Sequence, residues 1–271
     1  MDLADITPVI LTRDEEPNIA RTLAQLSWAK DVVVVDSFST DATAEIARRF
    51  PNVRLFQRAF DDHAKQWTFG QQQVRTPWFL ALDADYFVPD AFVRELEALV
   101  PGGVRGFRAS FRYAVGGRPL RASLYPPRIV LAATSHATFW QDGHTQRISV
   151  DGDVDDLREP IIHDDRKDFR SFVARQKRYM VAEAEKLRVR DPRALGLAAR
   201  VRKLIFIAPV AVLIHTLFVK GLILDGVPGL RYAWERFVAE LILSRELLRS
   251  AGATLPAGSS DPPSPAGPSS S

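Results

Sequence analysis

Short apolar runs alternate with amphipathic stretches along the first 85 residues. Four apolar, partly β-branched runs predict strands: 8–11, 32–35, 53–56 and 78–82. Three intervening stretches predict helices: 16–27, 43–50 and 62–75. Strands that alternate with helices indicate an α/β fold, in which a mostly parallel sheet carries helices on both faces.

Acidic residues follow three of the predicted strands. Asp14 and Glu15 come after the first strand, Asp36 ends the second, and Asp83 and Asp85 end the fourth. Ligands of open α/β sheets bind beyond the carboxyl ends of the strands. We therefore expect the three acidic clusters to face one crevice.

Asp83 and Asp85 are one residue apart at the end of the run Leu80–Leu82. On an extended backbone, alternate side chains share a face, so the two carboxylates would converge. Two hard oxygen ligands with open coordination positions suit Mg²⁺ or Mn²⁺ holding a substrate phosphate. The sequence thus predicts a divalent cation site here.

Three motifs in this order resemble the family 2 glycosyltransferases: PVILTRDEEPNI at 8–19, VVVVDSFSTDAT at 32–43 and LALDAD at 80–85. Members of this family have the GT-A nucleotide-diphospho-sugar transferase fold. The chain is most similar to the branch of lipopolysaccharide-core β-glucosyltransferases, with a resemblance that covers about residues 6–185. The turn at 36–43 is the most specific match, since its Asp, Ser, Ser, Asp and Thr all fall in register.

The resemblance implies roles for the strand-end residues. Asp36 would contact the nucleobase, Asp83 the nucleotide side of the donor, and Asp85 the divalent metal that bridges the diphosphate. Further nucleotide-sugar candidates lie in the same motifs: Asp14, Glu15 and Ser37. The activity implied is transfer of a hexose, with inversion, from a nucleotide sugar such as a UDP-sugar.

The chain departs from the branch pattern at three places. Asp14 replaces the usual Asn of the first loop, and Tyr86 stands where Glu commonly follows D-A-D. Thr145 follows His144 where the branch tends to carry His-Glu. A carboxylate lost there would alter or relocate the catalytic base.

An inverting transferase needs a base that takes the proton from the acceptor hydroxyl. Asp142 is one candidate, because its aromatic and Gly-bearing surroundings suit a sugar, and Asp164 or Asp165 is another. His163 would be a further metal ligand. The alternative interpretation is that Asp164 and Asp165 cap a helix that begins near Phe169.

Two basic residues are candidates for contacts with the diphosphate. Lys65 lies on the helix before Trp78, although an exposed surface lysine is the alternative. Arg178 lies in Gln176–Tyr179, which resembles the Q-x-x-R-W element of processive members but is one residue shorter. An amphipathic helix over 169–187 with solvated charges is the alternative there.

Composition limits the remaining possibilities. The 271 residues are 46% hydrophobic, enough for one catalytic domain and an appendage, and the formal net charge is +3. The absence of Cys excludes disulfides and thiolate chemistry and fits a reducing compartment. The first five residues lack the features of a secretory signal. An excess of Arg over Lys, with abundant Ala, is typical of a GC-rich bacterial genome.

The second half of the chain predicts a membrane-associating appendage. A densely basic stretch, 166–203, precedes the apolar run 204–219, which is shorter than a spanning helix and is closed by Lys220. We expect this run to lie in or dip into the cytoplasmic leaflet, held by anionic lipid. A true span and a buried helix of a soluble core are the alternatives.

The rest of the appendage is a turn at 225–229 and a helix at 230–249. From Ala251 the chain is rich in Pro, Ser, Gly and Ala and is expected to be disordered. Three parts are therefore predicted: a GT-A domain at 1–190, a helical membrane-associating region at 191–250 and a tail at 251–271.

Other classes of function fit less well. No nucleic-acid-binding motif is present, and an acidic crevice would repel phosphate in the absence of a metal. An NAD-type oxidoreductase and a sugar-nucleotidyltransferase would each need a Gly-rich phosphate loop after the first strand, which here is Thr12–Glu16. A non-catalytic membrane-bound protein on a transferase scaffold remains as the non-enzyme alternative.

We therefore expect a metal-dependent inverting glycosyltransferase. It would move a hexose from a UDP-sugar onto a glycolipid or a lipopolysaccharide-core-like acceptor, at the cytoplasmic face of the inner membrane.

Overall fold

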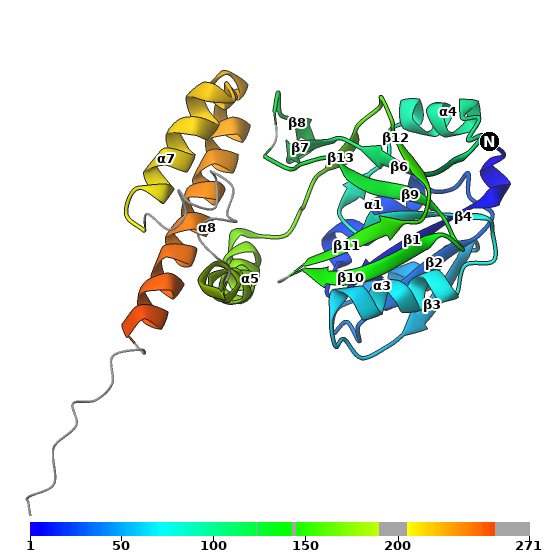
Figure 1. The fold of residues 1–271 in the computed structure, drawn as a ribbon, viewed down its shortest axis with the longest axis horizontal. Helices are drawn as coiled ribbons and strands as arrows, with labels where there is room; N and C mark the ends of the chain where they lie inside the picture. The colour runs from blue at the N-terminus through cyan, green and yellow to red at the C-terminus, as the bar shows by residue number, and fades with distance from the viewer. Residues whose placement is uncertain (123, 143–144, 190–204, 253–271) are drawn as a thin grey trace, which may run out of the picture.

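The computed structural model describes residues 1–122, 124–142, 145–189 and 205–252. A seven-stranded sheet with strand order β12-β6-β9-β4-β1-β2-β3 forms its centre (Figure 1). Its strands are β1 Ile6–Thr12, β2 Val32–Asp36, β3 Val53–Gln57, β4 Trp78–Asp83, β6 Val104–Ala109, β9 Arg128–Ala133 and β12 Asp153–Asp156. The four strands predicted from the apolar runs are confirmed.

The strands β4, β1, β2 and β3 are parallel, as predicted. In register, Leu11 lies opposite Asp83 and Thr12 lies opposite Asp36. The carboxyl ends of three neighbouring strands are therefore level, which brings their following loops to one edge of the sheet. Beyond β4, strand β9 runs antiparallel, so the sheet is mixed.

Helices cover both faces of this sheet, and the alternation of apolar side chains along the strands decides which face each contacts. They are α1 Glu16–Ala24, α2 Thr43–Arg48, α3 His63–Gln72 and α4 Asp90–Ala98. Ile10 and Val34 pack in the cluster that contains side chains of α1, α2 and α4, whereas Val9 and Val33 pack with Trp67 of α3. Each fully buried aliphatic side chain contributes about 1.5–3 kcal/mol.

Two smaller sheets extend the domain beside the level strand ends. One has the order β5-β13-β7-β8 and the other is the hairpin β10-β11. Their strands are β5 Tyr86–Phe87, β7 Phe111–Val115, β8 Arg118–Pro119, β10 Ala137–Asp142, β11 Thr145–Val150 and β13 Ile161–His163. Because β13 pairs with β5, His163 lies opposite Tyr86, directly after the aspartate pair.

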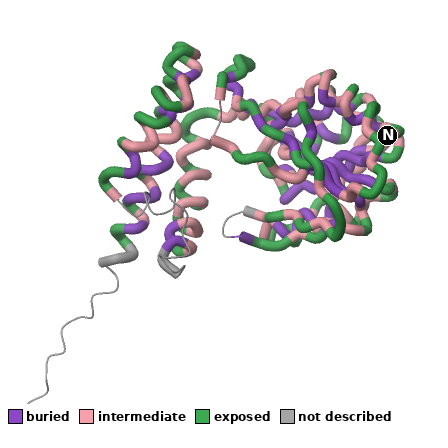
Figure 2. The backbone as a smooth tube through the Cα atoms, turned by 45° about the horizontal axis from the view of Figure 1, so that its top comes forward, coloured by how far each residue is buried: buried purple, intermediate pink, exposed green. Residues whose placement is uncertain are grey.

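Residues 205–252 form a helical unit that stands beside the β7–β8 end of the sheet domain, residues 1–163 (Figure 1). It contains α7 Ala208–Ile214, the π-helix η3 His215–Val219, the short 3-10 helix η4 Leu222–Asp225 and α8 Gly226–Gly252. The long helix α5 Phe169–Val189 packs against α8 through the buried side chains of Ala184, Leu187, Leu243 and Leu247. Buried segments concentrate in the sheet domain, whereas the helical unit is mostly half-buried or exposed (Figure 2).

The helical unit corrects one prediction. The turn expected at 225–229 does not form, because α8 begins at Gly226 and includes Pro228 in its first turn. Proline is tolerated there, since the first N–H groups of a helix have no partner within the helix. The chain reverses earlier instead, at Gly221, which has a φ of 71°. The stretch 190–204 and the tail beyond Gly252 lie outside the described residues.

Candidate functional site

Asp83 and Asp85 lie at the carboxyl end of β4, where the sequence placed them. Strand β4 ends at Asp83, and the chain turns at Ala84 and Asp85. The prediction that both aspartates extend from one strand face is therefore wrong. The carboxylates nevertheless interact, since burial and the charge of Asp85 together raise the pKa of Asp83.

Asp85 forms an ion pair with His163, whose Nε2 lies 3.0 Å from Asp85 Oδ2. Burial alone would raise the pKa of Asp85, but the charge and hydrogen bond of His163, together with the charges of Lys167 and Arg175, lower it overall. Burial would lower the pKa of His163, and here the charge of Asp85 raises it. His163 Nδ1 and Asp85 Oδ1 are both buried without a hydrogen-bond partner.

These residues fit a divalent cation that completes its coordination with substrate. Within the described parts of the chain, no three Asp, Glu, His or Cys side chains are grouped so that they could hold a metal by themselves. Mg²⁺ in phosphate-transfer sites is usually bound by one or two carboxylates together with substrate phosphates. Asp83 and the unpartnered Oδ1 of Asp85 provide such carboxylates. The raised pKa of His163 favours imidazolium, which has no free lone pair for a metal.

Three tyrosines surround His163. The ring centroids of Tyr113, Tyr86 and Tyr125 lie 4.3, 5.3 and 5.8 Å from its imidazole. Tyr86 also forms a hydrogen bond with Asp83, and Tyr125 forms one with Tyr86. Burial raises the pKa of Tyr125 to about 12, so these hydroxyls stay protonated near neutral pH. Of these tyrosines, the sequence analysis named only Tyr86, because no motif marks Tyr113 or Tyr125.

Asp36 is fully buried and organises the loop that follows β2. It accepts hydrogen bonds from Thr12 Oγ1 at 2.9 Å, from Gln57 Nε2 at 3.1 Å, and from both the backbone N–H and the hydroxyl of Ser39. Ser37 follows and accepts from Gln66 Nε2 at 3.0 Å. Both carboxylate oxygens of Asp36 are thus used within the protein, and its contact with a nucleobase stays a prediction.

The loop after β1 brings two further acidic residues to the same edge. Asp14 has a φ of 52° and accepts from the backbone N–H of Thr40 at 2.7 Å, which joins the first two acidic loops. Glu15 pairs with Lys167 Nζ at 2.5 Å. Burial and the charge of Asp85 raise the pKa of Glu15 to about 7. The expected convergence of the strand-end loops is thus present in the structure.

Asp142 is buried at the end of strand β10 rather than in an open loop. Its carboxylate accepts a hydrogen bond from Arg147 Nε at 2.7 Å and forms an ion pair with Lys186 Nζ of α5 at 2.9 Å. Burial would raise the pKa of Asp142, but these two cations lower it. A carboxylate held between two cations is a weak proton acceptor. Gly143 and His144, which follow it, lie outside the described residues.

Asp164 is buried with its carboxylate fully engaged. It accepts from Arg21 Nη1 and Arg166 Nε, each at 2.7 Å, and from the backbone N–H of Gly117 at 3.2 Å. This arrangement anchors the chain after β13. The interpretation that Asp164 or Asp165 caps the next helix is wrong, because Asp168 accepts from Ser171 N at the start of α5.

Asp165 lies between the sheet domain and α5. Its Oδ1 accepts from Asn18 Nδ2 at 3.1 Å and from the backbone N–H of Lys167 at 3.0 Å, and its Oδ2 pairs with Arg175 of α5. The charge of Asp165 also acts on His163. The carboxylate of Asp165 pairs with Arg175, whose charge also acts on Asp85, whereas Asp164 contacts Asp85 only through its backbone N–H, at 3.0 Å.

These loops and strands resemble those of a known family. Residues 8–123, less than half of the chain, match the family model described as glycosyl transferase family 2. The match begins within β1 and includes the loops that carry Asp14, Asp36, Asp83 and Asp85.

Two curated relatives resemble parts of the chain. The lipopolysaccharide core biosynthesis glycosyltransferase LpsC of Rhizobium meliloti is 26% identical over 118 residues, which are 41% of this chain and 44% of LpsC. An uncharacterized glycosyltransferase of Rickettsia typhi, RT0209, is 30% identical over 93 residues, 34% of this chain and 32% of its own length. The aligned segments therefore span less than half of either relative.

Among solved structures, S. aureus TarS in complex with UDP-GlcNAc aligns with a TM-score of 0.46 and 13% identity, over 91% of this chain and 92% of that one. Glucosyl-3-phosphoglycerate synthase from Mycobacterium tuberculosis, in complex with Mn²⁺, UDP-glucose and phosphoglyceric acid, aligns with a TM-score of 0.47 and 14% identity, over 69% and 81% of the two chains.

Two predicted phosphate contacts lie outside the network around Asp85. Lys65 is exposed on α3 and pairs with Asp62 at 3.0 Å, which matches the surface-lysine interpretation. Arg178 is exposed on α5. Its neighbour Tyr179 is closer to the site. Burial is the main cause of the raised pKa of Tyr179, and the charge of Asp83 also raises it.

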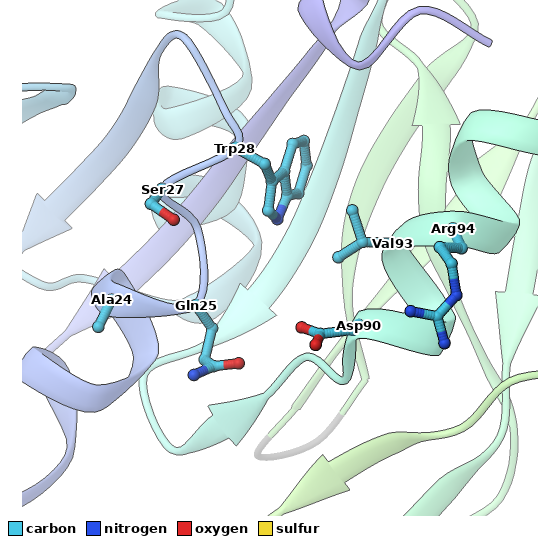
Figure 3. Close-up of a pocket in the computed structure, with 7 residues that line it drawn as sticks. All are labelled: Ala24, Gln25, Ser27, Trp28, Asp90, Val93 and Arg94. Carbon is cyan, nitrogen blue, oxygen red and sulfur yellow. The ribbon is translucent and has the colours of Figure 1, made fainter.

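A surface pocket of about 360 Å³ lies between the end of α1 and α4 (Figure 3). It is lined by Ala24, Gln25, Ser27, Trp28, Asp90, Val93 and Arg94. None of these residues belongs to the acidic loops that follow β1, β2 and β4. The candidate site is therefore the strand-end edge and not this pocket.

Replacement of Asp142 by Asn is expected to loosen α5 from the β10–β11 hairpin, because Lys186 and Arg147 lose a shared anion. The pKa of Asp142 is lowered in the folded protein, so its contribution is present above its ordinary value of 3.8 and is lost as the pH falls through the folded value. Thermal melting should show a deficit of about 1–3 kcal/mol at pH 7 that shrinks in acid. Equal deficits at both pH values would contradict this assignment.

Proposed function

We propose that this protein is a metal-dependent inverting glycosyltransferase that moves a hexose from a nucleotide sugar, a UDP-sugar, to a lipopolysaccharide-core-like or glycolipid acceptor. The observation that carries the proposal is the acidic edge of the family 2 domain, where Asp83 and Asp85 meet at the level ends of the strands. The likeness to LpsC, named for lipopolysaccharide core biosynthesis, supports the acceptor class.

The donor diphosphate would lie against Asp83 and Asp85. Two carboxylates repel a diphosphate, so binding requires a cation between them. When bound, Mg²⁺ or Mn²⁺ would neutralise the charge that develops on the leaving diphosphate. Asp85 would contribute its unpartnered Oδ1, while its Oδ2 stays with His163. The ion pair thereby orients the carboxylate.

We assign the base to Asp165. As the acceptor hydroxyl oxygen bonds to the anomeric carbon, the bond to the diphosphate breaks and Asp165 takes the hydroxyl proton. Asp142 and Asp164 are less suited, since each is buried and held by two cations. Asp165 is more exposed than either and is held by one cation, Arg175.

Calorimetric titration of UDP into the detergent-solubilised full chain, with Mn²⁺ or with EDTA, tests the donor site. Binding that requires the metal, together with transfer of glucose from UDP-glucose to a truncated lipopolysaccharide core, is the expected result. Nucleotide binding without transfer or donor hydrolysis, across several sugars, would favour a non-catalytic binding protein. Absence of binding to all nucleotides would overturn the proposal.

The proposed place of action is the cytoplasmic face of the inner membrane. Most exposed large apolar side chains in the described residues belong to the helical unit. They are Phe206, Ile207, Val210, Ile214, Phe218, Val219, Ile223, Leu224, Val227, Leu230, Trp234, Leu241 and Leu248. An apolar surface of this extent, with aromatic side chains, fits the interfacial region of a bilayer. The prediction that this region packs in a soluble core receives no support from these exposures.

Cations lie near this surface. A groove of about 290 Å³ between α5 and α8 is lined by Lys177, Arg245 and Arg249, with Glu246 and the apolar Val181 and Ile242. Basic side chains attract anionic lipid headgroups. Across the described residues, no single helix has the length and apolarity to cross a bilayer, although Ala208–Val219 and Leu222–Arg249, bent by 69°, meet that test as a pair.

Replacing Phe218 and Leu224 together by Glu is expected to reduce binding to vesicles that contain anionic lipid by at least about tenfold, because charged side chains resist burial in a bilayer. These side chains are 63% and 68% exposed, so folding should be unaffected. Val100→Glu is the matched control, since Val100 is 90% exposed in the sheet domain. Vesicle co-flotation measures the effect. Equal loss in the control, or none in the double variant, would contradict it.

A further inference from the structure

A continuous path of side-chain contacts joins the helical unit to Asp85. Tyr232, in the first turns of α8, is almost completely buried, and its ring lies 4.7 Å from that of Tyr113. The ring of Tyr113 lies 4.3 Å from the imidazole of His163, and His163 Nε2 lies 3.0 Å from Asp85 Oδ2. A residue of the helical unit is thus two contacts from the ion pair of the acidic edge.

The helical unit also forms hydrogen bonds with Arg121 and Leu124, which precede Tyr125, another ring in contact with His163. Asp225 accepts from the backbone N–H of Arg121 at 2.9 Å and from its Nε at 3.0 Å. The Tyr232 hydroxyl accepts from the backbone N–H of Leu124 at 3.4 Å. The next residue is Tyr125, whose ring contacts His163 and whose hydroxyl bonds to Tyr86.

The orientation of His163 depends on this packing. Its Nε2 bonds to Asp85, whereas its Nδ1 is buried and has no hydrogen-bond partner. Apart from the bond to Asp85, the rings of Tyr86, Tyr113 and Tyr125 hold the imidazole plane. Tyr113 contacts Tyr232 of the helical unit, and Tyr125 follows Leu124, which bonds to the Tyr232 hydroxyl.

We propose that Tyr232 and Asp225 are positioning residues for the donor site. This inference rests on the proposed function, which identifies that site. By fixing Tyr113, Arg121 and Leu124, they set the orientation of His163 and, through it, the free oxygen of Asp85. The helical unit is then part of the machinery for donor binding as well as the part of the chain that meets the membrane.

The test compares Tyr232→Ala, Tyr232→Phe and the control Arg231→Gln in the full chain. Arg231 is the exposed neighbour of Tyr232 and pairs with Glu235, one turn along the same helix. Hydrogen exchange of the segments 118–125 and 161–165 is followed by mass spectrometry, and UDP affinity is measured with Mn²⁺. Tyr232→Ala should speed exchange in both segments and weaken UDP binding by about tenfold or more. Tyr232→Phe keeps the ring and should preserve the exchange of 161–165 and most of the affinity, whereas Arg231→Gln should change neither.

Asp225→Ala keeps the test decisive if Tyr232→Ala does not fold. It should speed exchange in 118–125 and weaken UDP binding, and Arg121→Ala should add little to it, since the two side chains form one contact. Faster exchange in 118–125 with unchanged exchange in 161–165 would overturn the inference, as would unchanged affinity in Tyr232→Ala. If the unmodified protein binds no UDP, the proposed function fails, and the exchange of 161–165 alone decides whether α8 positions His163.

Discussion

Asp85→Asn is expected to abolish Mn²⁺-dependent binding of UDP, with affinity falling by at least about a hundredfold to the level of the unmodified protein in EDTA. The variant loses the charge on Asp85 Oδ1, the unpartnered oxygen that is proposed to hold the cation of the donor site. It also leaves His163 without its anionic partner. Breaking a fully buried pair costs about 3–5 kcal/mol, and these side chains are 12% and 17% exposed, so a smaller loss of stability is expected. Calorimetry with and without EDTA measures the first loss, and thermal melting measures the second.

Asp156→Asn is the matched control for this prediction. Asp156 pairs with Arg108 at 2.8 Å on the same sheet, but both side chains are exposed. Exposed pairs contribute about 0–1 kcal/mol, so the control should keep both stability and UDP affinity. Mn²⁺-dependent binding that survives in Asp85→Asn would show that the cation is not held at this carboxylate.

Asp165→Asn is expected to lower the rate of sugar transfer by about 10²–10⁴-fold, the usual contribution of a general base. UDP affinity should stay within a few-fold, because Asp165 acts on the acceptor side. A fall in kcat without a matching change in nucleotide binding separates loss of the base from loss of the donor site. Steady-state transfer from UDP-glucose to a truncated lipopolysaccharide core provides the measurement.

Asp164→Asn distinguishes catalysis from structure in this segment. Asp164 is buried between Arg21 and Arg166, so its replacement should lower the melting temperature before it affects the chemical step. If Asp164→Asn lost activity at full stability while Asp165→Asn remained active, the assignment of the base would be wrong.

The parallel half of the sheet could be predicted because each strand is marked locally. The runs 32–35 and 78–82 are apolar on both faces, and helical spacing separates them. Strand β9 was not predicted, since its antiparallel place beside β4 depends on pairing between residues about 50 positions apart, such as Phe79 with Ala132. The start of α8 was also misplaced, because Gly and Pro in 226–229 resemble a turn.

In the candidate site, too, locally marked residues could be predicted, whereas contacts between distant segments could not. Asp36, Asp83 and Asp85 could be predicted because they follow or end apolar strands, whereas the side chains that surround these carboxylates come from distant segments. The pairing of His163 with Asp85 joins residues 78 positions apart. Tyr113 and Tyr125 carry no motif, so their contact with His163 is visible only in the folded chain.

If the exposed apolar face of the helical unit meets a bilayer as proposed, the place where α8 joins the sheet domain sets how far an acceptor must extend from that bilayer. Val227 is exposed only five positions before Tyr232, about 7–8 Å along a helix axis. From Tyr232, two successive ring contacts with centroid distances of 4.7 and 4.3 Å lead to His163. A bilayer in contact with Val227 would therefore lie within about 20 Å of the acidic edge. A lipid-anchored saccharide would meet the donor with only its first few sugars outside the headgroups. The helical unit would then select acceptors by the length of their glycan as well as by its chemistry.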